Sequence, residues 1–174
     1  MSWRVPLTQL EIPEHEVEAV LDCLRSGWLT MGPRTGEFEQ RFAGYVGSPF
    51  AIAVSSGTAA LHLSCVAAGL GPGDEAIVSG MTFVSTPAAV RMTGATPVLC
   101  EISGTHDFNL DVQEVERLIT PRTRAVIAVH CFGYPAPMER LRELCDERGL
   151  ILIEDSAQAV GPWNAAEVKR YAVT

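Results

Sequence analysis

Two acidic residues follow a stretch that should form a buried strand. Residues 150–153 are all apolar, and Glu154 and Asp155 come directly after them. A short apolar run of this kind is typical of a parallel strand that is buried on both faces. We therefore expect Asp155 at the carboxyl end of the strand, the edge where open α/β sheets bind ligands. Alone it is ambiguous, because a carboxylate there can also cap the next turn.

Small and hydroxyl-bearing residues follow a second apolar stretch, much earlier in the chain. Residues 51–54 lead into Ser55, Ser56, Gly57 and Thr58, and a helical pattern comes next. Backbone N–H groups at the N-terminus of a helix attract anions, so a phosphate could bind at this turn. The same residue types are also common helix caps, so the turn by itself is weak evidence for a ligand.

Two further side chains are expected at the same edge of the sheet. Phe83 follows a predicted strand that ends at Ser79, and its ring could lie over a flat ligand or pack in the core under a loop. His130 ends the apolar run 125–129, and a lone histidine is more often structural than a ligand. An anion site, a ring-sized slot, an aromatic platform and a carboxylate together fit pyridoxal phosphate.

Other nucleotide and nucleophile motifs are absent or misplaced. The glycines of residues 69–73 end a predicted helix and precede a strand, whereas a dinucleotide-binding motif follows a strand and opens a helix. The sequence contains neither a Walker nucleotide-binding motif nor a G-x-S-x-G nucleophile elbow. A nicotinamide-dependent enzyme is therefore the weakest of the functional hypotheses.

The order of predicted elements would bring these residues to one sheet. One helix is predicted between Pro13 and Gly27 and another that ends at Gly47, and together they form an N-terminal helical arm over residues 1–48. Strands are then predicted near 50–54, 76–79, 97–102, 125–129 and 150–154, and helices near 58–68, 85–92, 112–119 and 138–148. This alternation predicts a three-layer α/β/α fold with a mainly parallel sheet.

Composition narrows the class of protein. The net charge of −8 argues against nucleic acid and anionic membranes as partners. The first residues lack the apolar core of a signal peptide, and no run approaches the roughly 18 apolar residues of a membrane span, so a cytoplasmic location is the default. Five scattered cysteines, without C-x-x-C spacing, predict neither disulfides nor a metal site.

Eight stretches resemble one known family, at near-continuous spacing from about residue 7 to residue 161. They are residues 27–33, 54–61, 71–75, 82–84, 94–98, 119–125, 129–130 and 153–161. The chain resembles the DegT/StrS-like sugar aminotransferases, which depend on pyridoxal phosphate and have fold type I. The resemblance implies that residues 49–161 are a truncated large domain of such a transferase and that residues 162–174 are a divergent tail.

The resemblance also implies roles for individual residues. Six would bind the cofactor: Ser56, Gly57 and Thr58 at the phosphate, Phe83 on the pyridine ring, Asp155 at the pyridinium nitrogen and Gln158 at the phenolic oxygen. Trp28, Thr30 and His130 would contact the substrate or support the structure. The role of Asp155 has the clearest physical basis, because a carboxylate beside the ring nitrogen keeps that nitrogen protonated.

The family's reaction implies partners that the chain should also have. An amino group passes from an amino acid, usually glutamate or glutamine, to a nucleotide-linked keto-sugar, and paired subunits share active sites. A lysine holds the cofactor as a Schiff base, but Lys169 is too close to Asp155 to match it. We therefore expect a homodimeric family, and a truncated chain that exposes strand edges, is marginally stable and is inactive alone.

Two alternatives remain open. The chain could be a non-catalytic paralogue, or a dimer partner that contributes the loop around Trp28. It could also belong with the dehydratases of the family, in which histidine replaces the lysine.

Overall fold

The chain forms two compact units, residues 1–38 and 39–174. The computed structural model describes residues 10–106, 108–160 and 171–173. In the first unit, helix α1 (Glu14–Ser26) ends at Gly27, which has a left-handed φ of 71° and donates its N–H to the carbonyl of Leu24, as the sequence predicts. None of its residues is buried. Helix α2 (Pro33–Val46) follows and continues into the second unit.

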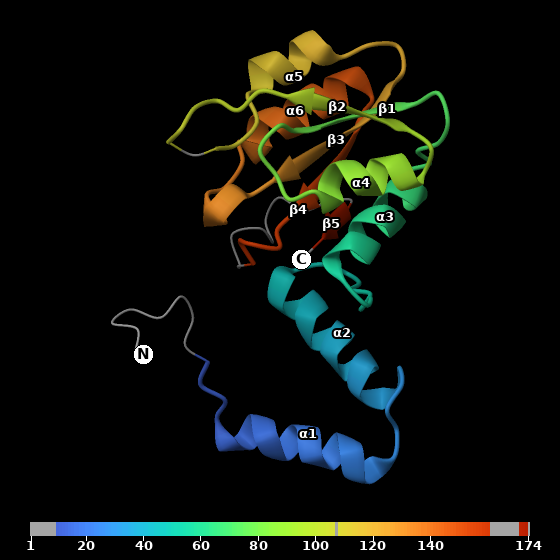
Figure 1. The fold of residues 1–174 in the computed structure, drawn as a ribbon, viewed down its shortest axis with the longest axis vertical. Helices are drawn as coiled ribbons and strands as arrows, with labels where there is room; N and C mark the ends of the chain where they lie inside the picture. Colours follow the sequence, from blue (N-terminus) through green and yellow to red (C-terminus); the bar gives the residue numbers. More distant parts are fainter. Residues whose placement is uncertain (1–9, 107, 161–170, 174) are drawn as a thin grey trace, which may run out of the picture. The chain divides into compact units, whose positions relative to one another are not determined.

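The second unit is built on a parallel sheet (Figure 1). Its strands are β1 (Glu75–Ser79), β2 (Thr96–Cys100), β3 (Thr123–Val129), β4 (Ile151–Asp155) and β5 (Tyr171–Val173), in the spatial order β2-β1-β3-β4-β5. All four pairings are parallel. The predicted mainly parallel α/β fold is therefore confirmed.

Helices cover both faces of this sheet, which gives the three predicted layers. Helices α3 (Gly57–Ala67) and α4 (Ser85–Met92) lie on one face, and α5 (Val112–Leu118) and α6 (Met138–Arg148) lie on the other, with a short 3₁₀ turn η1 (Cys131–Gly133) after β3. On the first face, Leu61 of α3 and Val90 of α4 pack in one core cluster with Ile153 of β4. On the second, Leu141 of α6 packs with Leu152.

The strand predicted near residues 50–54 does not form, and this expectation was wrong. Residues 51–54 have no regular structure, and the side chains of Phe50 and Ile52 are 81% and 80% exposed. The N–H of Ala53 is donated to the Glu39 carboxylate over 2.9 Å instead of to a strand. A strand needs a hydrogen-bonding neighbour, and none of the described strands lies beside this segment.

The tail predicted for residues 162–174 lies mostly outside the described residues, and so does Lys169. Tyr171–Val173 is the exception, because it forms β5 beside β4. In the part of the chain that the structure describes, no helix is long and apolar enough to cross a membrane. The same residues contain no cluster of three histidine, cysteine or acidic side chains that could bind a metal ion.

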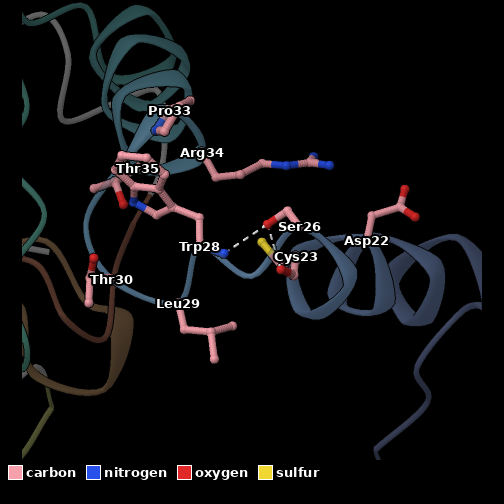
Figure 2. Close-up of a pocket in the computed structure, with 10 residues that line it drawn as sticks. Asp22, Cys23, Ser26, Trp28, Leu29, Thr30, Pro33, Arg34 and Thr35 are labelled. Atoms are coloured by element: carbon pink, nitrogen blue, oxygen red, sulfur yellow. Dashed lines mark hydrogen bonds between the residues drawn. The ribbon is translucent and has the colours of Figure 1, made fainter.

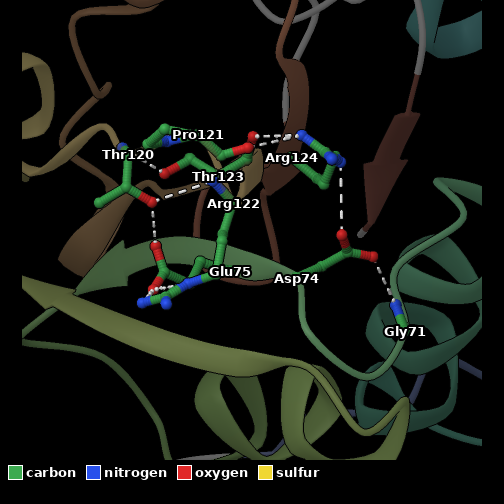
Figure 3. Close-up of polar contacts among 8 residues, drawn as sticks. All are labelled: Gly71, Asp74, Glu75, Thr120, Pro121, Arg122, Thr123 and Arg124. Atoms are coloured by element: carbon green, nitrogen blue, oxygen red, sulfur yellow. Dashed lines mark hydrogen bonds and ion pairs between the residues drawn. The ribbon is translucent and has the colours of Figure 1, made fainter.

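Two acidic residues anchor the edge of the sheet where β1 and β3 begin (Figure 3). The buried carboxylate of Glu75 accepts hydrogen bonds from the Thr120 hydroxyl (2.5 Å) and from the guanidinium of Arg122. These two partners, Thr120 first, hold the pKa of Glu75 below its ordinary value. Beside it, Asp74 pairs with Arg124 over 3.3 Å. The contacts tie the loop before β3 to the start of β1.

Candidate functional site

The end of β4 points its side chains alternately to the two faces of the sheet. Ile153 belongs to the core cluster under α3 and α4, whereas Leu152 belongs to the cluster under α5 and α6. Because side chains alternate along a strand, Asp155 lies on the α3/α4 face and Glu154 on the α5/α6 face. The candidate carboxylate therefore shares its face with the helix that begins at Gly57.

Asp155 is a buried carboxylate with few partners. It is 7% exposed, and its Oδ1 accepts the N–H of Ala157 over 3.2 Å. Burial raises the pKa of its carboxyl group, and the hydrogen bonds from Ala157 and from the Thr86 hydroxyl act in the opposite direction. Among the described residues no lysine or arginine pairs with it. A site of this kind favours a cationic N–H from a ligand.

The N-terminus of α3 offers the second half of the candidate site. Ser56 caps the helix in an extended conformation, and its Oγ accepts the N–H of Ala59 over 3.2 Å. The N–H groups of Gly57 and Thr58 lie in the first turn, where a helix has no carbonyl of its own to accept them. A Cβ atom at Gly57 would meet nothing within 4 Å, so a ligand could approach the backbone there. The turn therefore has the room and the donors that an anion needs.

The loop that carries Phe83 is linked to Asp155 through Thr86. The Phe83 ring is 72% exposed, so the alternative of a core aromatic does not describe it. Its carbonyl accepts the N–H of Thr86 over 3.1 Å, and the Thr86 hydroxyl lies 2.9 Å from that of Thr82. Thr86 is fully buried in the first turn of α4. Sequence reasoning missed this residue, and its place three residues after Phe83 is the only signal that could have identified it.

His130 reaches the predicted edge, but its side chain lies on the other face. Its backbone N–H is donated to the carbonyl of Asp155 over 3.1 Å, which places the two residues side by side. The imidazole is 2% exposed, and Nε2 lies 2.6 Å from a carboxylate oxygen of Glu154. Its Nδ1 accepts the N–H of Ala136 over 2.8 Å. Both ring nitrogens of His130 therefore have hydrogen-bond partners within the protein.

Gln158 lies at the same edge, on the turn that follows β4. Its side-chain oxygen accepts the N–H of Phe132 over 2.6 Å. That bond orients the amide, and the NH₂ is the hydrogen-bond donor that Gln158 can offer to a ligand. Phe132 has a left-handed φ of 54°, a strained conformation for a residue with a side chain, and such strain is concentrated at functional sites.

Trp28 and Thr30 belong to a separate hollow within the first unit (Figure 2). The hollow has a volume of about 510 Å³, and Trp28 lies at its wall with 58% of its surface exposed. The indole N–H is donated to the carbonyl of Met31 over 3.0 Å. A Cβ atom at Gly32 would come within 2.2 Å of the indole nitrogen, so the ring position depends on that glycine.

Comparison with known proteins identifies a family and several relatives that match most of the chain. Residues 10–170 match the DegT/DnrJ/EryC1/StrS aminotransferase family. The chain is 44% identical to the spore coat polysaccharide biosynthesis protein SpsC of Bacillus subtilis over 149 residues, which are 86% of the chain and 38% of SpsC. It is 42% identical to the GDP-perosamine synthase of Caulobacter vibrioides over 159 residues, which are 91% of the chain and 43% of that enzyme. The chain thus spans about two fifths of the length of these relatives.

Solved structures agree with this assignment of fold. DesV of S. venezuelae superimposes with a TM-score of 0.82 at 45% identity, over 85% of this chain and 40% of DesV. A protein described as a sugar aminotransferase, Spr1654 of Streptococcus pneumoniae in its PMP form, gives a TM-score of 0.86 at 32% identity over 91% of this chain and 44% of its own.

Proposed function

Because the chain belongs to the DegT/DnrJ/EryC1/StrS aminotransferase family, we propose that it provides the cofactor-binding part of a sugar aminotransferase that depends on pyridoxal phosphate. The reaction transfers an amino group from an amino acid, glutamate or glutamine, to a nucleotide-linked keto-sugar. One observation carries the proposal: the buried carboxylate of Asp155 lies on the same face of the sheet as the open N-terminus of α3. A cationic ring nitrogen and a phosphate are the groups that these two ends favour.

In addition to Asp155, described residues would contact the cofactor at three points. Ser56, Gly57 and Thr58 would hold its phosphate with first-turn N–H groups and hydroxyls. The exposed ring of Phe83 would lie on the pyridine face. Gln158 would donate its NH₂ to the phenolic oxygen, because that oxygen is an acceptor and the Phe132 N–H already orients the amide.

The chemical role of the protein is to hold protons and orient the ring. When bound, pyridoxal phosphate supplies an electron-accepting ring, which stabilises the negative charge left when the amine loses its α-proton. Asp155 would keep the proton on the ring nitrogen, because a buried carboxylate favours a cation beside it. Thr86 would orient Asp155 through its hydroxyl. The N-terminus of α3 would fix the other end of the ring.

The family's Schiff-base lysine has no match in this sequence. Lys169 is the only lysine in the sequence, and its context does not match that of the family's lysine. We therefore propose that the chain alone binds the cofactor without a covalent bond and does not complete the transfer. The same observation favours a second candidate, a non-catalytic dimer partner in a family whose subunits share active sites.

Borohydride reduction tests this proposal on the full chain. We expect the absorbance of pyridoxal 5′-phosphate to change when it binds the chain. Ser56→Ala should reduce this change. The control Ser64→Ala, which replaces a serine near the other end of α3, should leave it as in the parent chain. After reduction, mass spectrometry should find the unmodified chain. Failure to bind would contradict the proposal, and a reduced adduct on Lys169 would contradict the non-covalent part of it.

A further inference from the structure

Three buried polar side chains lie directly behind Asp155, on the opposite face of the sheet. His130, Glu154 and Ser156 are 2%, 3% and 0% exposed. One carboxylate oxygen of Glu154 lies 2.6 Å from Nε2 of His130 and 3.2 Å from the Ser156 hydroxyl. The proposed binding of cofactor uses none of these side chains, although isolated buried polar groups are costly to keep.

The hydrogen-bond pattern fixes the protonation of this group. The backbone N–H of Ala136 can only donate, so Nδ1 of His130 must accept and carries no proton. The single ring proton is therefore on Nε2 and is donated to Glu154. The Ser156 hydroxyl donates to the same oxygen, so Glu154 acts as a carboxylate acceptor with two donors.

This arrangement is not that of a nucleophilic triad. In such a triad the histidine bonds the hydroxyl that it activates, and the carboxylate orients the histidine from its other nitrogen. Here the Ser156 hydroxyl bonds Glu154, and the other nitrogen of His130 is occupied by a backbone amide. The three side chains are also shielded from solvent, so a substrate would not reach them.

The positions of the three residues around Asp155 indicate that they orient its side chain. Glu154 and Ser156 directly precede and follow Asp155, and both are held on the far face. His130 adds a backbone hydrogen bond to the carbonyl of Asp155 over 3.1 Å. Because neighbouring side chains of a strand point to opposite faces, fixing the two flanking residues fixes the direction in which Asp155 points.

We propose that His130, Glu154 and Ser156 form a positioning network that holds the Asp155 carboxylate in the direction of the bound ring nitrogen. The network acts through the backbone of the β4 terminus and does not touch the ligand. The inference rests on the proposed function, because that function requires Asp155 to contact the ring nitrogen. The fixed orientation of Asp155, however, should exist without any ligand.

The first test therefore uses the full chain without ligand. Three-bond NMR couplings report the χ1 rotamer of Asp155, which should be single in the parent chain. Glu154→Gln, which keeps an acceptor but removes the charge, should give averaging between rotamers, and the milder Ser156→Ala should do so to a smaller extent. The control is Glu139→Gln, which neutralises an exposed glutamate on α6. A single Asp155 rotamer in all four proteins would overturn the proposal.

The second test asks whether the network acts through Asp155. Glu154→Gln should weaken binding of pyridoxamine 5′-phosphate about tenfold, because a misdirected Asp155 would lose its charge-assisted hydrogen bond to the ring nitrogen. Binding of inorganic phosphate, which does not involve Asp155, should be unchanged. In an Asp155→Asn background the same substitution should change affinity less than about twofold. Equal losses in both backgrounds would mean a merely structural role and would overturn the proposal. If the parent chain binds no pyridoxamine 5′-phosphate, the proposed function fails, while the rotamer test still decides the positioning role.

Discussion

Replacement of Asp155 by asparagine should weaken cofactor binding and stabilise the protein that has no ligand. The carboxylate is 7% exposed, and it is held by the Ala157 amide and the Thr86 hydroxyl, with no lysine or arginine paired to it among the described residues. A hydrogen bond to a charged group contributes about 1.5–3 kcal/mol, so loss of the charge should weaken binding of pyridoxamine 5′-phosphate roughly 10- to 150-fold. Asparagine has nearly the same shape, so packing should be retained.

The effect on stability has the opposite sign. Burial raises the pKa of Asp155 in the folded protein, so the folded state binds more protons than the unfolded state just above the ordinary carboxyl pKa. Stability is therefore lost as pH rises through that range. Asparagine cannot ionise, so the variant should unfold at a higher temperature than the parent near pH 7, and the difference should vanish in acid.

Thermal unfolding followed by circular dichroism, with and without ligand, measures both effects. For a domain of this size, each 1 kcal/mol corresponds to roughly 2–4 °C in the unfolding temperature. Asp146→Asn, which changes an exposed carboxylate of α6, is the control. If Asp155→Asn lowered the unfolding temperature at pH 7, or bound pyridoxamine 5′-phosphate as tightly as the parent, the conclusion that Asp155 is a buried carboxylate that favours a cationic ligand would be refuted.

Three other substitutions probe the contacts around the site and the sheet. Thr86→Val should weaken pyridoxamine 5′-phosphate binding by roughly 2- to 10-fold, measured by titration, because the Asp155 carboxylate loses the hydroxyl that orients it but keeps its own contact with the ligand; unchanged affinity would contradict the role of Thr86. Glu75→Gln should reduce the pH dependence of the unfolding temperature in acid. The lowered pKa of the Glu75 carboxyl stabilises the folded state above pH 4.5, and this stabilisation is lost as pH falls. The same pH dependence in the variant and the parent would contradict this. Gly32→Ala should displace the indole of Trp28 and shift its NMR N–H signal, whereas Gly36→Ala, where a Cβ meets nothing within 4 Å, should not; equal shifts would exclude the steric explanation.

Much of the fold follows from local sequence pattern. The predicted limits of α4 and α6 agree with the structure, and Gly27 ends α1 in the left-handed conformation that the pattern requires. These elements carry their signals within a few residues, in apolar spacing and in caps. The segment 50–54 has the same apolar character but forms no strand, because a strand depends on a neighbour that local sequence does not encode.

The candidate site could be predicted only in outline. The edge position of Asp155 follows from the apolar run before it, and the helix start at Gly57 follows from its cap residues. The sequence did not indicate that the His130 ring faces away from Asp155, because that depends on the alternation of side chains at the end of β3 and on the contact with Glu154. Nor did it indicate Thr86, whose contact with Asp155 joins residues that are distant in sequence.

The most direct test of the central claim is an NMR titration of the full chain with pyridoxamine 5′-phosphate. The claim is that the turn at Gly57 and Thr58 and the carboxylate of Asp155 bind opposite ends of one ligand. The backbone amides of Gly57, Thr58 and Ala157 should then shift together, with one dissociation constant, and inorganic phosphate should shift only the first two. Separate dissociation constants at the two ends, or a response at one end alone, would contradict the account.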